Sequence, residues 1–409
     1  MRCRHCQAGL NHVFLDLGYA PPSNAYLSEA ELHAPEVTFP LKLYVCDQCW
    51  LVQTIDYSRA DELFAHDYAY FSSTSQSWLQ HAADYADMIS KRLSLSQRSF
   101  VIEVASNDGY LLKNFLSAGV PCLGIEPTSS TAVAAQELGI PVMQEFFGAQ
   151  TARHLLQEGK QADLICGNNV YAHVPDINDF TEGLEIALKE GGTITLEFPH
   201  LMRLIQHTQF DTVYHEHFSY LSLTSATSIF SKAGLRIYDV QELPTHGGSL
   251  RLFGCREADP RPTEPAVSEM LKREEDFGLL DLRLYKDFQG KANTVKNNFL
   301  AFLLEQKELG KSVAAYGAAA KGNTLINYAG LKTDIIDFVC DAAPSKQGKF
   351  LPGSHIPILP PDQLAARQPD WVVILPWNLS EEIIKQHGNA VTSWGGQFAV
   401  AVPKMAILA

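Results

Sequence analysis

The stretch SFVIEVASNDGYLL, residues 99–112, joins a short apolar strand to a turn of small polar residues and the start of a helix. In open α/β sheets, a turn of this kind at the carboxyl end of a strand is the usual cradle of a cofactor. The turn contains one glycine, Gly109, and lacks the G-x-G-x-x-G pattern that holds a dinucleotide pyrophosphate. The stretch therefore predicts an α/β domain whose cofactor has no pyrophosphate.

The sequence around this turn alternates short apolar runs with segments long enough to form helices. Apolar runs of four to eight residues bounded by turn signals are typical of buried strands. The runs expected to form strands are 99–106, 121–128, 141–147, 162–170 and 192–200, with helices between them, for example at 129–138 and 176–189. This rhythm predicts a doubly wound parallel sheet.

The carboxyl part of this domain departs from the strand–helix rhythm. A helix is expected at about 222–233, and two strands follow at 235–244 and 249–255, joined by the turn THGG at 245–248. So short a connection makes the two strands antiparallel. An antiparallel pair that ends an otherwise parallel sheet differs from the nicotinamide-binding arrangement and is typical of Rossmann-like methyltransferases.

Polar residues lie at the ends of further predicted strands. Glu126 ends the second strand, where a carboxylate can accept hydrogen bonds from both hydroxyls of a ribose. S-Adenosylmethionine (SAM) fits this pattern, and the alternative is an ordinary strand–helix turn with a helix cap at Ser106 or Asn107. The residues expected to bind the cofactor are Glu103, Ala105, Asn107, Asp108, Gly109, Glu126, Asn168 and Asn169.

Residues 1–65 are turn-rich and contain two close cysteine pairs, Cys3 with Cys6 and Cys46 with Cys49. A two-residue gap lets one turn present two thiolates to one ion, and four thiolates close a tetrahedral zinc site. Because a fourth thiolate occupies the reactive position, we expect structural zinc. Catalytic zinc and a redox pair remain alternatives, and a small sheet is expected between the two pairs.

The run Tyr214-His215-Glu216-His217 collects four polar or titratable side chains within a largely apolar segment. Such a cluster is a metal site, a satisfied structural network or a proton-transfer site. An extended segment would place His215 and His217 on one side, whereas a helical turn would bring Tyr214 and His217 together. We favour proton transfer at neutral pH, with His173 at the same sheet edge as a second candidate.

Residues 259–409 are expected to form helices over about 261–310 and then a second, smaller α/β unit. Its first strand leads into the glycine-rich loop YGAAAKGNT at 316–324, which places Lys321 at a helix N-terminus. Backbone N–H groups and an ammonium there make an anion site suited to a nucleotide diphosphate. Close packing of a strand on a helix would explain the small residues equally well.

Length and charge restrict the function further. With 409 residues the chain is too long for one core, and we divide it into domains at 1–65, 66–258 and 259–409. The net charge of −14 excludes nucleic acid as an expected partner. The absence of a signal-like apolar segment and of membrane-length apolar runs predicts a cytoplasmic protein. We expect a monomer or a small homo-oligomer.

With these motifs in place, the chain resembles the sugar C-methyltransferase family over nearly its whole length. The resemblance rests on the paired cysteines and on VASNDGYLL, GNNVYAHV, YHEHFSYLSL, HGGSLR and GAAAKGNT. It implies an N-terminal zinc-binding domain, a class I Rossmann-like SAM methyltransferase core and a C-terminal Rossmann-like domain that holds a nucleotide sugar. The implied catalytic residues are Tyr70, His173, Tyr214, Glu216 and His217, and the expected substrate-binding residues are Arg251, Gly317, Lys321 and Asn323.

The resemblance implies methylation of carbon 3 of a nucleotide-linked 4-keto-deoxyhexose in deoxysugar biosynthesis. We expect His217 to remove the proton next to the ketone, and Glu216 to orient His217 or hold the substrate. Tyr214 or His173 would donate to the developing enolate oxygen. The alternatives are methylation of oxygen or nitrogen, nucleotide-sugar oxidoreduction, and a non-catalytic nucleotide-sugar-binding protein.

Overall fold

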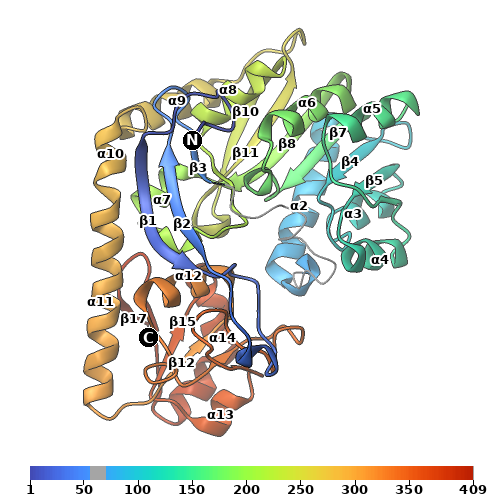
Figure 1. Ribbon diagram of the computed structural model, residues 1–409. Coiled ribbons are helices and arrows are strands. Elements are labelled where there is room, and N and C mark those ends of the chain that lie inside the picture. The colour runs from blue at the N-terminus through green and yellow to red at the C-terminus, as the bar shows by residue number, and fades with distance from the viewer. Residues whose placement is uncertain (56–70, 409) are drawn as a thin grey trace.

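The computed structural model describes residues 1–55 and 71–408, which form three sheets and their covering helices (Figure 1). The expected fold class is confirmed: a small N-terminal sheet, a large mixed α/β sheet and a smaller C-terminal α/β sheet follow one another along the chain. Among the described helices, none combines the length and apolar character that crossing a bilayer would require.

The N-terminal sheet has the strand order β1-β2-β3-β9 and is antiparallel throughout. The expected sheet between the cysteine pairs is present, because β1 follows the first pair and β2 leads into the second. The fourth strand, β9, comes from the segment just after the Tyr214–His217 cluster and pairs with β3. The N-terminal sheet therefore includes part of the candidate site. Its strands are β1 (His12–Ala20), β2 (Phe39–Val45), β3 (Val52–Thr54) and β9 (Ser219–Tyr220).

The large sheet has the order β10-β11-β8-β7-β4-β5-β6, with β11 antiparallel to both of its neighbours and the other pairings parallel. The five expected parallel strands and the terminal antiparallel pair are all confirmed. The strands are β4 (Val101–Val104), β5 (Cys122–Ile125), β6 (Val142–Met143), β7 (Ala162–Asn168), β8 (Leu188–Pro199), β10 (Leu235–Leu243) and β11 (Ser249–Arg256).

Helices cover both faces of this sheet, because its central strands are apolar on both sides. Along β4, Ile102 packs in one core cluster and its neighbour Val101 in another. Side chains alternate across a strand, so both faces need a cover. The covering helices are α2 (Gln76–Leu93), α3 (Leu112–Ser117), α4 (Ser129–Glu137), α5 (Ala149–Gln157), α6 (Ile177–Ala187) and α8 (Leu223–Lys232). Helix α7 (Leu201–Gln206) packs instead in the core cluster of the N-terminal sheet.

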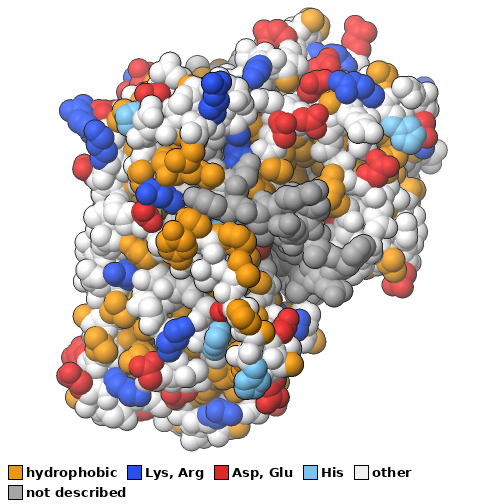
Figure 2. Space-filling model, viewed as in Figure 1, with side chains coloured by type: hydrophobic (Ala, Val, Ile, Leu, Met, Phe, Trp, Pro, Cys, Tyr) orange, Lys and Arg blue, Asp and Glu red, His pale blue; other side chains and the backbone are white. Residues whose placement is uncertain are grey.

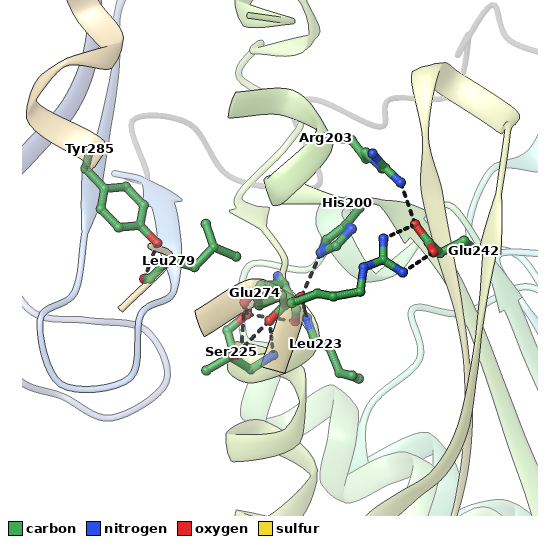
Figure 3. Close-up of polar contacts among 11 residues, drawn as sticks. His200, Arg203, Leu223, Ser225, Glu242, Glu274, Leu279 and Tyr285 are labelled. Atoms are coloured by element: carbon green, nitrogen blue, oxygen red, sulfur yellow. Dashed lines mark hydrogen bonds and ion pairs between the residues drawn. The ribbon is translucent and has the colours of Figure 1, made fainter. Parts of the chain in front are cut away.

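A buried carboxylate fixes the first linker helix, α9 (Pro265–Phe277), to the large sheet. Figure 3 shows Glu274 of α9 against His200, at the end of β8, and against the first turn of α8. Glu274 lies 2.7 Å from His200 Nε2 and accepts hydrogen bonds from the backbone N–H groups of Leu223 and Thr224. A carboxylate at this position caps the positive end of α8.

The linker continues through α10 (Leu282–Lys286) and α11 (Phe288–Glu308), a long helix that runs beside β1 towards the C-terminal domain (Figure 1). Phe14 of β1 stacks on Phe288 at a ring distance of 4.7 Å and meets Tyr285 edge-on at 5.5 Å. At the other end of α11, Phe302 packs against Trp371 of the C-terminal sheet. Helix α11 therefore connects the N-terminal sheet to the C-terminal sheet.

The C-terminal sheet has the order β14-β13-β12-β15-β16-β17, with only β17 antiparallel to its neighbour. The expected strands are present, whereas the two edge strands have only two and three residues and lack a sequence signal. The strands are β12 (Val313–Tyr316), β13 (Val339–Cys340), β14 (Ile358–Leu359), β15 (Trp371–Ile374), β16 (Gln397–Val400) and β17 (Ala406–Leu408), and the helices are α12 (Ala320–Ala329), α13 (Gln363–Arg367) and α14 (Ser380–Ser393).

Candidate functional site

A cavity of about 900 Å³ lies where the three domains meet. Its walls come from the carboxyl ends of β4, β5 and β7, from the Tyr214–His217 cluster, from the loop after β1 and from the start of α12. In Figure 2 the acidic and basic side chains are interspersed over the face shown. Because the charges on this face do not mark the cavity, we describe it by the residues that line it. Among the expected site residues, those lining it are Ala105, Asn107, Glu126, Asn168, Asn169, His173, Tyr214, Glu216, His217 and Lys321.

The turn after β4 has an uncommon backbone. Ala105, Asn107 and Gly109 all have positive φ angles, of 56°, 49° and 78°. This region is open to glycine but disfavoured for alanine, so the turn keeps this shape against a local cost. A Cβ on Gly109 would collide with Ile140. One side of the turn therefore lines the cavity, and its other side packs tightly against Ile140.

Glu126 lies at the end of β5 and reaches this turn. Its carboxylate accepts hydrogen bonds from the backbone N–H of Asn107 and of Thr128, both at 2.9 Å. Each carboxylate oxygen retains a further acceptor position. Since the side chain also lines the cavity, Glu126 is placed to accept hydrogen bonds from a bound diol.

The end of β7 supplies two amides to the cavity. Asn168 is 8% exposed, and neither its Oδ1 nor its Nδ2 has a hydrogen-bond partner among the described residues. Buried amides are rarely left unpaired, so Asn168 points to a ligand that would complete its hydrogen bonds. Asn169, with a φ of 57°, donates from Nδ2 to His246 Nε2 at 3.0 Å.

Glu103 and Asp108 lie behind the turn rather than on the cavity wall. Glu103 is fully buried, and burial, followed by the carboxylates of Glu126 and Asp108, raises its pKa well above the ordinary value. Asp108 Oδ2 accepts a hydrogen bond from the backbone N–H of Ser73 at 3.0 Å. Glu103, Asp108 and Gly109 were expected to bind the cofactor. They support the conformation of the turn and do not line the cavity.

Tyr214 and His217 form a hydrogen-bonded pair across a single tight turn. The His217 N–H donates to the Tyr214 carbonyl at 3.0 Å, and the Tyr214 hydroxyl lies 2.7 Å from His217 Nε2. The segment is therefore not extended, and a tight turn brings Tyr214 and His217 together, as the helical-turn alternative had placed them. Burial, followed by the nearby His173 and His246, lowers the pKa of His217 well below 6.5. The imidazole is neutral at pH 7 and able to take a proton.

His173 and His215 lie on opposite sides of this pair. The rings of His173 and His217 are 4.5 Å apart, and burial lowers the pKa of His173 to about 4. His215 turns away, with Nε2 3.3 Å from the Phe39 carbonyl of β2. Within the described residues, only the four N-terminal cysteines bring three or more potential metal ligands together, so the geometry does not support metal at Tyr214–His217.

Glu216 points into the cavity from the same segment. Its two oxygens lie 2.9 and 2.8 Å from Nδ2 of Asn24, in the loop after β1. Tyr70, the remaining expected catalytic residue, lies outside the described residues, as does the neighbouring Tyr68. The described part of the cluster therefore gives one imidazole–phenol pair, a second imidazole and a carboxylate around one space.

Lys321 is the second residue of α12 and lines the cavity opposite the turn after β4. Its ammonium donates to Asn378 Oδ1 at 2.6 Å and lies 4.8 Å from the ring centre of Trp377. Burial lowers its pKa, and the carboxylate of Asp211 partly offsets that effect. The expected helix N-terminus with its lysine is confirmed in position and faces the cavity.

The other three expected substrate-binding residues lie outside the cavity wall. Asn323 is buried and donates from Nδ2 to the Ser23 carbonyl at 2.6 Å. Gly317 has a φ of 91°, and a Cβ there would collide with Pro376. Arg251 forms a buried ion pair with Glu197 at 2.5 Å. These three residues therefore stabilise the structure next to the cavity and do not line it.

Polar and aromatic lining residues that the sequence reasoning did not single out include Asn24, Trp78, His246 and Lys346. His246 belongs to the recognised THGG turn, where a histidine beside two glycines was a signal available in the sequence. In the structure its φ is 55°. Trp78 packs edge-on against His246 at 5.3 Å. The other two residues reach the cavity only through the packing of domains, which no local pattern indicates.

The four N-terminal cysteines converge, with their Sγ atoms all within 4.8 Å of one another. The closest pairs, Cys3 with Cys49 and Cys6 with Cys46, are 3.5 Å apart. Zn–S bonds of ~2.3 Å in a tetrahedron separate sulfurs by roughly 3.8 Å, so the cluster fits zinc. These thiolates would fill all four positions of the ion, which is the arrangement of a structural site.

The chain is 34% identical over 406 residues to the C-methyltransferase NovU of Streptomyces niveus, covering 99% of this chain and 96% of that protein. The chain belongs to the C-methyltransferase family. Family models described as “Putative zinc binding domain”, “Methyltransferase domain” and “C-methyltransferase C-terminal domain” match residues 3–64, 76–240 and 244–403 of this C-methyltransferase. It is a SAM-dependent methyltransferase with an N-terminal zinc-binding domain.

Solved structures match a smaller part of this C-methyltransferase. The magnesium protoporphyrin IX methyltransferase of Synechocystis, with bound SAH, is 15% identical and has a TM-score of 0.34, covering 44% of this chain and 82% of that one. The PH0226 protein of Pyrococcus horikoshii is 14% identical with a TM-score of 0.38, covering 46% and 95%.

The first prediction concerns cofactor binding by this C-methyltransferase. Replacing Glu126 by Gln removes a charged acceptor from the cavity, and hydrogen bonds to charged groups contribute about 1.5–3 kcal/mol. We expect the affinity for S-adenosylhomocysteine, measured by calorimetry, to fall about tenfold or more. The matched control, Glu137→Gln on the exposed side of α4, should bind as the wild type does. Equal affinity for both variants would contradict the assignment of Glu126.

The second prediction concerns stability at low pH. Burial lowers the pKa of His173 and His246 to about 4, and that of His217 falls well below 6.5. The unfolded chain, with histidines near 6.5, therefore binds more protons between pH 6.5 and 4, so stability falls as the pH drops, by about 1.4 kcal/mol per pH unit for each imidazole. The raised pKa values of Asp211, about 6, and Glu103 oppose this trend.

Three imidazoles against two carboxyl groups leave a net loss of stability on acidification. We expect a lower melting temperature at pH 5 than at pH 7.5 and a smaller drop for His246→Gln, which removes one of these imidazoles. Melting curves recorded across this range test the expectation. An identical pH dependence in the wild type and the variant would contradict it.

Proposed function

We propose that this C-methyltransferase methylates carbon 3 of a nucleotide-linked 4-keto-deoxyhexose, in deoxysugar biosynthesis in the cytoplasm. One observation carries the proposal. The neutral His217–Tyr214 pair opens into the same cavity as Glu126 and Asn168 on one side and Lys321 on the other. A methyl donor, a carbon acid and an anionic group would thus meet in one space.

Carbon attacks a methyl group only as a carbanion-like nucleophile, so the acceptor must first lose a proton. SAM, when bound, supplies the electrophilic methyl group. In the proposed reaction His217 takes the proton from carbon 3, and the electron pair of that C–H bond moves into the enolate of the neighbouring ketone. For this step the Tyr214 hydroxyl leaves His217 Nε2, which it meets at 2.7 Å in this structure, and donates its one hydrogen bond to the enolate oxygen as charge develops there. Carbon 3 then forms the bond to the methyl carbon while the sulfur–methyl bond breaks.

His173 and Glu216 complete the proposed acceptor site. His173 packs against His217 and would limit the positions open to its ring. Glu216, held by Asn24, would accept a hydrogen bond from a hydroxyl of the sugar. In this proposal Tyr70 is also a catalytic residue, as the family resemblance implies.

Lys321 is the proposed contact for the nucleotide diphosphate. Its ammonium and the first N–H groups of α12 provide positive charge at the cavity wall opposite the cofactor turn. We assign this role to the unit formed by residues 259–409, and the zinc site and methyl transfer to residues 1–65 and 66–258. In this scheme the acting species is a monomer or a small homo-oligomer, with no nucleic-acid or membrane partner.

Product analysis tests the proposed function. The enzyme is incubated with SAM labelled with ¹³C at the methyl group and a panel of 4-keto nucleotide sugars. Mass spectrometry should detect a gain of one methyl group, and carbon-13 NMR should find it bonded to carbon 3. A methyl group on oxygen or nitrogen, or no transfer to any member of the panel, would contradict the proposal.

A further inference from the structure

Asn24 lies in the N-terminal domain, yet its side chain lines the cavity beside Glu216. Its Nδ2 lies 2.9 Å from Oε1 and 2.8 Å from Oε2 of that carboxylate. An ionised carboxylate only accepts hydrogen bonds, so the NH₂ group of the amide must face Glu216. One amide group therefore contacts both oxygens of a carboxylate that is 2% exposed.

The orientation of Asn24 is supported from behind by Tyr26. The Tyr26 hydroxyl shares its one proton between Asn24 Oδ1, at 3.3 Å, and the carbonyl of Ala318, at 2.5 Å. Lys346 donates to the same carbonyl at 2.9 Å. Burial, followed by the carboxylates of Asp341 and Glu216, raises the pKa of Tyr26 well above its ordinary value, so its hydroxyl stays protonated. These contacts connect Asn24 to the loop before α12.

The surroundings of Glu216 make such support necessary. A buried carboxylate is costly unless hydrogen bonds satisfy it, and an unsupported one takes up a proton instead. An Asn24 amide fixed from behind holds the Glu216 carboxylate in one orientation. Because Glu216 lines the cavity, a hydroxyl of the acceptor can reach the carboxylate that Asn24 holds.

We propose that Asn24 is a positioning residue for methyl transfer, which holds the Glu216 carboxylate in the orientation that aligns the acceptor. This inference rests on the proposed function, in which Glu216 contacts the sugar. It gives the zinc-binding domain a direct part in the reaction, because the domain places a side chain at the cavity wall. Positioning affects the reactive geometry more than the binding of either substrate.

Asn24→Ala and Asn24→Asp, beside the wild type, test the inference. For Asn24→Ala we expect kcat to fall roughly 10- to 100-fold, the penalty typical of a reactant displaced by about 1 Å. The KM for the sugar and the affinity for S-adenosylhomocysteine should stay within about threefold, since the amide touches neither in this account. Asn11→Ala, an exposed asparagine of the same domain, is the matched control and should keep wild-type kinetics.

Asn24→Asp supplies a readout that a purely structural role would not change. Two carboxylates in contact share one proton, and the introduced carboxyl group, when protonated, can donate to Glu216 as the amide did. The activity of this variant relative to the wild type should therefore rise severalfold between pH 8 and pH 6. The relative activity of Asn24→Ala should stay constant over the same range.

The outcomes separate two kinds of failure. If the wild type methylates no 4-keto nucleotide sugar, the proposed function is wrong and the inference falls with it. If the wild type is active and Asn24→Ala matches its kcat, only the inference is overturned. If Asn24→Ala melts too early to assay, the pH profile of Asn24→Asp decides, and a profile parallel to that of the wild type would overturn the inference.

Discussion

Replacing His217 by Asn should abolish most methyl transfer while leaving the cofactor site intact. His217 is the neutral imidazole of the cavity whose Nε2 meets the Tyr214 hydroxyl at 2.7 Å. Asparagine keeps a polar side chain of similar size but cannot take a proton. General base catalysis typically contributes 10²–10⁴-fold, so we expect kcat to fall about 10³-fold. The affinity for S-adenosylhomocysteine should change little.

A matched histidine makes this experiment specific. His215 is two residues away in the same segment, is buried like His217, and faces the Phe39 carbonyl outside the cavity. His215→Asn should therefore retain kcat within a fewfold and lose only some stability. Steady-state rates with calorimetry on both variants provide the comparison. Equal losses of kcat would show that the segment acts through its fold and would contradict the assignment of His217 as base.

The second large effect is expected from the zinc site. Replacing Cys46 by Ala removes one of four converging thiolates, and zinc binding contributes much of the folding free energy of small zinc domains. We expect loss of the bound zinc, a melting temperature lower by about 10 °C, and loss of turnover. Zinc content by elemental analysis and melting curves measure the first two effects.

Loss of turnover follows because the first cysteine turn contacts the methyltransferase domain. Arg4 donates to the carbonyl of Pro175, a residue of the cavity wall, and His5 Nδ1 lies 2.8 Å from Asn178 Oδ1. Cys122→Ala is the control, since Cys122 is a buried cysteine of β5 outside the zinc cluster. That variant should keep its zinc. A Cys46→Ala protein with one zinc per chain and unchanged melting would contradict the structural assignment.

The fold was predictable where the local sequence determines the structure. The run Val101–Val104 is buried at every position, as expected of a central parallel strand. The spacing of the two cysteine pairs predicts that they lie together, because each pair occupies one turn and four thiolates complete the coordination of one zinc ion. The edge strands β14 and β17 were missed because two or three residues are too few to show a period.

The cavity was predictable where its residues belong to local motifs: the strand ends on its cofactor side, the Tyr214–His217 run and the loop that carries Lys321. Glu126 and Asn168 end parallel strands, and parallel strands place their carboxyl ends at one edge. No local pattern predicts the role of Asn24, because it contacts Glu216 across 192 residues of sequence. Gly317 and Asn323 belong to a recognisable loop, yet tertiary packing turns them towards Pro376 and Ser23 rather than into the cavity.

The central claim is that this enzyme makes an enolate before it transfers the methyl group. The most direct measurement is hydrogen exchange at carbon 3 of the 4-keto nucleotide sugar, in deuterated buffer with S-adenosylhomocysteine in place of the methyl donor. Proton NMR should show the carbon 3 signal disappear with wild-type enzyme and persist with His217→Asn. A wild-type enzyme that methylates carbon with SAM, yet exchanges no carbon 3 proton under these conditions, would contradict the account.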